Sequence, residues 1–147
     1  MAGWKKVMTA SGGTFTGAVT HNGNVDFDGD VNVDGSLKSP PSAVSVSANQ
    51  LYTLDFAAAT NFQLSLASSF TLGTSNTASC IGQTGVIILI QDSTGGRTPT
   101  LTSDWQTPRG DSISFDTTAS KISMLSYYIQ ASGVVFVNYM GKFGIPS

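Results

Sequence analysis

The stretch that decides the fold of the N-terminal part is residues 14–37, which read TFTGAVTHNGNVDFDGDVNVDGSL. Glycine recurs every six residues from Gly17 to Gly35, and Val or Leu follows each glycine two residues later. Because six is a multiple of two, this repeat is also a strand pattern. Odd positions are apolar or glycine except for His21, and even positions are mostly Thr, Asn and Asp. We therefore expect a β-stranded segment with one apolar face and one polar, acidic face.

The apolar face of this segment has nothing in its own length to cover it. A single-chain left-handed β-helix needs several stacked turns to bury a core, and four hexads are too few. Three chains around a common axis would share one core, and the glycines would let the three backbones approach closely. The sequence thus predicts a homotrimeric shaft with these interface residues: Phe15, Gly17, Val19, His21, Gly23, Val25, Phe27, Gly29, Val31, Val33, Gly35 and Leu37.

Two consecutive prolines, Pro40 and Pro41, mark the end of the shaft, because proline cannot continue a paired strand. Ahead of the repeat, Trp4, Lys5 and Lys6 combine an aromatic ring with two charges and are expected to attach the trimer to a larger assembly. The predicted division is an attachment arm at residues 1–13, a shaft at 14–37, a linker at 38–43 and a head at 44–147.

The head contains about nine short runs of β-forming residues separated by turn signals, which is typical of a β-sandwich or jelly roll. Residues 92–97, between two such runs, are predicted to form a hairpin loop in which Gly95 and Gly96 supply positive φ. The predicted fold class is all-β, with the trimeric shaft followed by a β-sandwich or jelly-roll-like head. The expected head strands cover residues 44–46, 51–56, 62–66, 70–72, 86–91, 98–101, 112–115, 122–130 and 134–139.

The composition argues against several classes of partner. All nine acidic residues are Asp, the basic residues number seven and the net charge is −2, which does not favour nucleic acid or an anionic membrane surface. The longest strongly apolar run, Val86 to Ile90, is too short for a bilayer span, and the first residues lack the apolar stretch of a signal peptide. A single cysteine, Cys80, suits synthesis in a reducing host cytoplasm.

No constellation for catalysis is evident. The only histidine, His21, is far along the chain from Cys80, and most Asp residues of the head neighbour Gly, Ser or Thr in apparent turns. We predict no enzymatic activity and no cofactor. A hexapeptide-repeat acyltransferase is the enzyme alternative, but it needs a much longer β-helix, and His21 in the apolar face is poorly placed to act as a base.

Two arrangements in the shaft invite comparison with ion sites. Three copies of His21 could meet on the three-fold axis. Asp26, Asp28 and Asp30 present alternate carboxylates, but the stretch lacks the glycine and glutamate spacing of an EF-hand. We predict no metal site and interpret the carboxylates as a solvated strand face.

The aromatic residues of the head are the candidates for surface contact. Trp105 and Arg109 lie in a polar loop and are predicted to contact a partner. Tyr127 and Tyr128 could stack on a sugar ring, although core packing is the favoured interpretation. A carbohydrate-binding module is therefore a remote alternative function.

The repeat GNVDFDGDVNVDGSL at residues 23–37 resembles the hexad-bearing shafts of trimeric tail fibres and related phage appendages. The head is similar to a β-rich module of tailed-phage structural proteins, including those of phages that infect marine cyanobacteria. The segments that carry this second resemblance are residues 54–56, 61–64, 82–87, 91–98 and 125–128. The resemblance implies a trimer on the exterior of the virion, in contact with other virion proteins.

Two structural roles fit that resemblance. The modest length and peptide-sized anchor favour a capsid decoration protein or short head fibre. The alternative is a short tail fibre or baseplate-tip protein whose head contacts a glycan or protein of the host surface.

Overall fold

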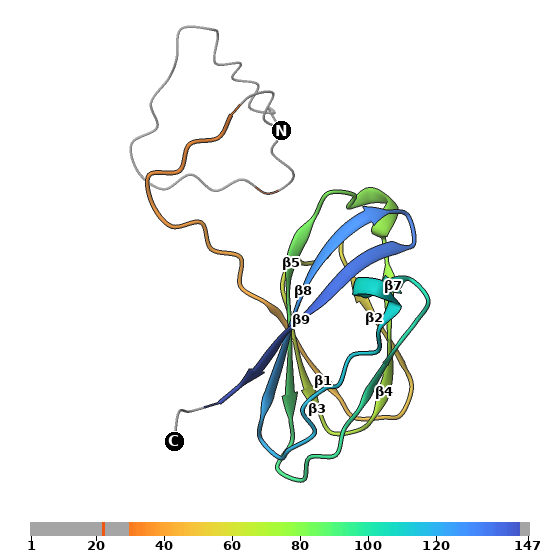
Figure 1. Ribbon diagram of the computed structural model, residues 1–147. Helices are drawn as coiled ribbons and strands as arrows, with labels where there is room; N and C mark the ends of the chain where they lie inside the picture. The colour runs from red at the N-terminus through yellow and green to blue at the C-terminus, as the bar shows by residue number, and fades with distance from the viewer. Residues whose placement is uncertain (1–21, 23–29, 145–147) are drawn as a thin grey trace, which may run out of the picture. The chain divides into compact units, whose positions relative to one another are not determined.

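The computed structural model describes Asn22 and residues 30–144. The chain divides into two units, Met1–Leu37 and Lys38–Ser147, and all strands among the described residues belong to the second, which we call the head (Figure 1). No helix of the described residues is long and apolar enough to cross a membrane.

The predicted shaft falls largely outside the described residues. This holds for Trp4, Lys5 and Lys6 and for the predicted interface positions from Phe15 to Gly29, His21 included. Val31, Val33 and Leu37 are described; in the single chain they form no strand, and their side chains are exposed by 56%, 47% and 87%. These three apolar side chains are therefore largely uncovered in the single chain. The trimeric shaft stays a prediction.

Two sheets make up the head, as the strand pattern predicts. One has six strands in the order β1-β3-β5-β8-β9-β7, and the other has three in the order β2-β4-β6. Two short 3-10 turns are the only helical segments among the described residues. The strands are β1 (Ser42–Val46), β2 (Leu51–Asp55), β3 (Phe62–Leu66), β4 (Phe70–Ser75), β5 (Thr84–Gln91), β6 (Pro99–Leu101), β7 (Trp105–Gln106), β8 (Ile122–Ala131) and β9 (Val134–Phe143), and the turns are η1 (Thr77–Ser79) and η2 (Pro108–Gly110).

The first six strands alternate between the two sheets and stack in parallel. β1, β3 and β5 pair in parallel in one sheet, and β2, β4 and β6 do so in the other. Antiparallel pairing appears only in β5–β8 and β8–β9 of the described part. An all-β head with two sheets is confirmed, whereas the antiparallel jelly-roll arrangement is not what the first six strands form.

The segment at residues 92–97 is not the predicted hairpin loop, because β5 and β6 lie in different sheets. The carboxylate of Asp92 accepts hydrogen bonds from the backbone N–H groups of Thr94 and Gly95 and from the guanidinium of Arg97. Buried Gln91 fixes the same segment through two hydrogen bonds with the Arg97 backbone. These bonds turn the chain from one sheet to the other. Gly95 and Gly96 have positive φ, as expected.

The expected strand at residues 112–115 does not form, and the only strand of that region is β7. Ile113 and Phe115 nevertheless pack against the core. The alternating pattern that suggested a strand thus reflects the packing of Ile113 and Phe115 against the core on a segment that pairs with no described strand.

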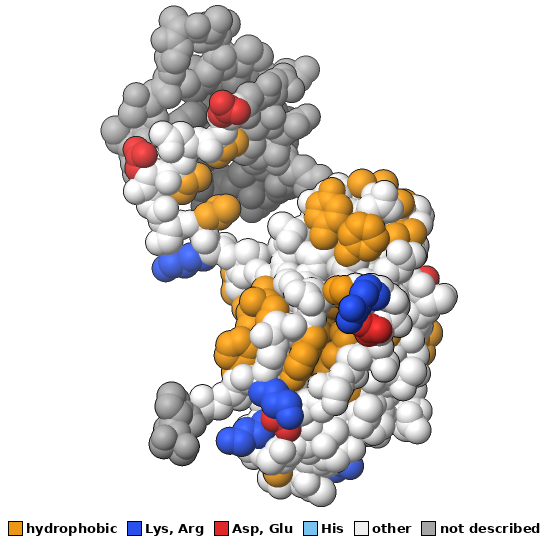
Figure 2. All heavy atoms as spheres, viewed as in Figure 1, with side chains coloured by type: hydrophobic (Ala, Val, Ile, Leu, Met, Phe, Trp, Pro, Cys, Tyr) orange, Lys and Arg blue, Asp and Glu red, His pale blue; other side chains and the backbone are white. Residues whose placement is uncertain are grey.

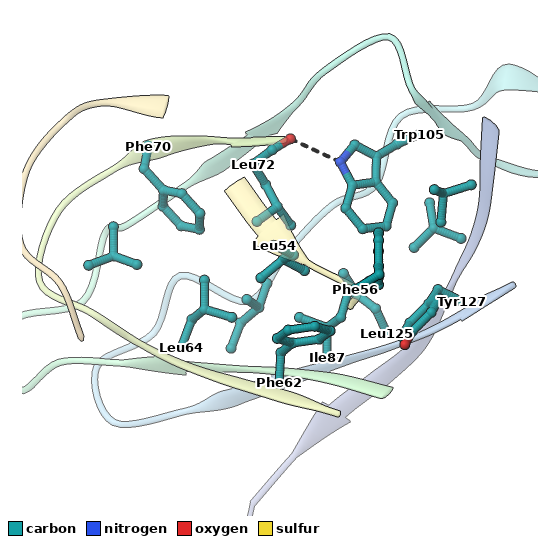
Figure 3. Close-up of a cluster of buried hydrophobic side chains, with 14 of the residues drawn as sticks. Leu54, Phe56, Phe62, Leu64, Phe70, Leu72, Ile87, Trp105, Leu125 and Tyr127 are labelled. Atoms are coloured by element: carbon teal, nitrogen blue, oxygen red, sulfur yellow. Dashed lines mark hydrogen bonds between the residues drawn. The ribbon is translucent and has the colours of Figure 1, made fainter. Parts of the chain in front are cut away.

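The core lies between the sheets and is organised around Phe56 (Figure 3). The ring of Phe56 contacts Phe62 edge-on with centroids 5.7 Å apart, Tyr127 at 4.9 Å and Trp105 at 6.2 Å. Aromatic pairs in such geometries add to the free energy gained from their burial. The indole Nε1 of Trp105 donates to the carbonyl oxygen of Leu72 at 2.9 Å, which joins the two sheets.

Gly85 should not tolerate a side chain. A Cβ there would overlap the carbonyl oxygen of Thr60 and lie 3.0 Å from the ring of Tyr127. We expect Gly85→Ala to lower the free energy of unfolding by at least about 2 kcal/mol, measured by denaturant unfolding. The control is Gly144→Ala, whose added methyl group would meet only the flexible side chain of Lys121. Equal free energies of unfolding for the two variants would contradict the close approach of Gly85 to Thr60 and Tyr127.

The hydrogen bonds of Asp92 predict a pH dependence. The Arg97 guanidinium, followed by the N–H groups of Gly95 and Thr94, holds the pKa of Asp92 below its ordinary value of 3.8. A lowered folded-state pKa contributes stability that is present above the unfolded-state pKa and is lost as pH falls through the folded-state pKa. The thermal midpoint of the wild type should exceed that of Asp92→Asn at pH 7, and the difference should narrow below pH 3.8. A difference in thermal midpoint that does not change with pH would contradict the stabilising role of the Asp92 carboxylate.

Candidate functional site

A groove of about 550 Å³ opens beside the hairpin end of β8 and β9. Figure 2 shows hydrophobic side chains gathered over this end of the head. The groove is bordered by the start of β5, by β8 and β9, and by β7 with the turn that follows it. Its lining residues are Thr84, Gln106, Thr107, Pro108, Ser126, Tyr127, Tyr128, Phe136, Val137 and Asn138.

Two exposed aromatic rings form much of the apolar part of the groove, which also includes Pro108 and Val137. Tyr128 on β8 and Phe136 on β9 are direct partners across the antiparallel pair. Their ring centroids are 6.5 Å apart, their planes are inclined by 32°, and the residues are exposed by 45% and 46%. Neighbouring rings of this kind offer a large, rigid surface on which a flat apolar face of a ligand can stack.

Five of the other lining side chains are uncharged and polar. Gln106 and Asn138 supply amides, and Thr84, Thr107 and Ser126 supply hydroxyl groups. Ser126 and Asn138 are partners across β8 and β9. Because none of the described residues that line it is charged, the groove suits a neutral ligand rich in hydroxyl groups better than an ionic one.

The neighbouring residue Tyr127 fixes β8 in place. Its hydroxyl group donates to the carbonyl oxygen of Thr60 at 2.6 Å and accepts from Nε2 of Gln83 at 2.9 Å. Burial raises the pKa of Tyr127 above its ordinary value, which further favours the neutral hydroxyl that donates this bond. Since successive side chains of a strand point to opposite faces, anchoring Tyr127 inward holds Tyr128 outward.

The prediction that Trp105 contacts a partner is wrong. Trp105 is only 6% exposed, and its indole is held in the core by Phe56 and the carbonyl group of Leu72. Arg109 is exposed, with positive φ and an ion pair to Asp111 at 3.0 Å. A contact through Arg109 stays a prediction.

The two tyrosines have different environments. Core packing was the favoured interpretation for both, and it is confirmed for Tyr127, which is 3% exposed, but not for Tyr128. Sequence reasoning missed Phe136 altogether. The signal was present, because residues 134–138 read VVFVN and the alternation places Phe136 on the face opposite Val135 and Val137.

The two shaft arrangements compared with ion sites lie mostly outside the described residues. Asp30 is exposed, and Asp26, Asp28 and His21 lie outside the described residues. Within the part that is described, no group of three His, Cys, Asp or Glu side chains is placed to hold a metal ion.

Comparison with known proteins gives one finding. Residues 49–134, more than half of the chain, match the family model described as "Putative phage tail fibre C-terminal domain". No curated protein matches, and no solved structure matches. The match begins just before β2 and reaches the first residue of β9, so it includes Tyr128 and ends before Phe136. The chain therefore belongs to the phage tail fibre C-terminal domain family and is a phage structural protein.

Proposed function

We propose that three copies of this chain form the tip of a tail fibre or baseplate, on the exterior of the virion, and that the head binds neutral glycans of the host surface. The family match favours this tail role over the capsid decoration predicted from the sequence. The family is structural rather than catalytic, in keeping with a binding role.

The observation that carries the glycan proposal is the exposed pair of Tyr128 and Phe136 in an uncharged groove. Sugar rings have apolar C–H faces that stack on aromatic rings, and hydroxyl groups that bond to amides and hydroxyls. Both kinds of group lie together here, and all of the polar groups except the Thr107 hydroxyl are on strands. A site held by paired strands loses little conformational entropy when a ligand binds.

The groove is tested by binding of the full chain to an array of neutral and acidic oligosaccharides. The wild type should retain neutral glycans, and Tyr128→Ala and Phe136→Ala should each weaken binding about tenfold, ~1.4 kcal/mol. Tyr128→Phe should keep most of the affinity, because it keeps the ring. Thr100→Ala is the control, since Thr100 is exposed on β6 in the other sheet.

Two outcomes would contradict the glycan proposal. One is that wild-type protein retains no glycan on the array. The other is that Tyr128→Ala and Phe136→Ala bind as well as Thr100→Ala, with circular dichroism showing that all three are folded.

The tail location is tested by cryo-electron microscopy of purified particles. We expect density for the chain in groups of three on the tail or baseplate. Copies at the centres or junctions of capsomers would overturn the tail role and restore capsid decoration, whatever the glycan measurements show.

A further inference from the structure

The outer face of the six-stranded sheet is apolar away from the groove. In β5, Ile87 and Leu89 are buried in the core, while Val86, Ile88 and Ile90 point to the other face and are partly exposed. A sheet with one face in water normally alternates apolar and polar residues, and strands that are apolar on both faces are typical of sheets covered on both sides. In the single chain, nothing among the described residues covers this second face of β5 completely.

The apolar surface continues onto β8 and β9, whereas the outward neighbours of β5 on β3 are the polar residues Gln63 and Ser65. Ile90 pairs with Ile122 of β8, which pairs with Phe143 of β9. Ile88 pairs with Met124, and the bulge opposite Met124 leaves Met140 unpaired. Phe143 and Met140 are exposed by 44% and 49%. We call these residues the outer apolar band: Val86, Ile88, Ile90, Ile122, Met124, Met140 and Phe143.

We infer that the outer apolar band is the surface through which the heads of neighbouring copies of this chain pack on one another. The inference rests on the trimer in the proposed function and adds an interface that the shaft repeat does not contain. Contiguous exposed apolar surface of this kind marks protein interaction sites.

The chemistry of the band suits a second copy of the same chain. None of its residues is charged, so two copies of the band can meet without placing like charges within the contact. Lys121 borders the band beside Ile122 and Phe143. Its aliphatic and methionine side chains are those of a permanent interface, which resembles a protein core in composition. A sugar would find no amide or hydroxyl group within the band.

The length of the linker also supports a second copy of the chain as the partner of the outer apolar band. The predicted shaft ends at Leu37, and β1 of the same six-stranded sheet begins at Ser42. The few residues between them span less than about 20 Å even when fully extended. A trimeric shaft would therefore hold three heads close to one axis, and at such a high effective concentration even a modest contact forms.

Oxidation of the native methionines can show whether the outer apolar band is covered. Met124 and Met140 belong to it, and Leu51→Met adds a reference methionine at a 59% exposed position of β2, in the other sheet. The full chain with Leu51→Met is treated with dilute peroxide, and oxidation at each site is followed by peptide mass spectrometry at low conversion. We expect Met140 to oxidise at least tenfold more slowly than the reference methionine, and light scattering to show a trimer.

Each other outcome overturns the inference in a distinguishable way. A trimer in which Met140 oxidises as fast as the reference site rejects the head interface and leaves the trimer and the glycan site intact. A monomer with a protected Met140 shows that another part of the same chain covers the band. A monomer with an unprotected Met140 rejects the inference together with the trimer of the proposed function.

A charged variant provides the second test. Met124→Lys places a charge in the outer apolar band without touching the core, and Thr100→Lys places one on the outer face of the other sheet. We expect Met124→Lys to raise the oxidation rate of Met140 toward that of the reference site, and Thr100→Lys to leave Met140 protected. Glycan binding per folded head should survive in both variants. Equal protection of Met140 in the two variants would overturn the inference.

Discussion

The in-register stacking of parallel strands is the constraint on which the head depends. Phe62 of β3 lies beside Ile87 of β5, and Leu64 lies beside Leu89, so each inward residue is placed over another. A shift of one residue in any of these pairs would turn the whole apolar set of a strand away from the core. The register therefore fixes which side chains fill the space around Phe56. It equally fixes which ones are left on the outside of the sheet.

The groove is a consequence of that core. Tyr127 is anchored by Phe56, Gln83 and the carbonyl group of Thr60, and its ring lies so close to Gly85 that a Cβ there would come within 3.0 Å of it. With Tyr127 fixed inward, the next residue of β8 faces outward beside its cross-strand partner on β9. Pre-organisation of this kind lowers the entropic cost of binding, because the aromatic surface exists before any ligand arrives.

Sequence reasoning found most strands, because alternation and turn residues act locally. It did not find the parallel pairing, since a period of two is the same in parallel and antiparallel sheets, and the partner of a strand is set by contacts far along the chain. Trp105 was misplaced because its neighbours Asp104 and Pro108 are polar or turn-forming. The flanking sequence did not reveal the carbonyl group of Leu72, which satisfies the indole in the core.

The two apolar surfaces of the outer sheet face differ in the chemistry that surrounds them. Beside Tyr128 and Phe136, amides and hydroxyl groups can keep bonds to water until a ligand replaces it, so that surface can remain exposed at little cost. The seven residues of the outer apolar band have no such groups in their side chains, so exposure of the band to water costs free energy. The surface beside Tyr128 and Phe136 therefore suits a partner that binds reversibly, and the outer apolar band suits a permanent partner.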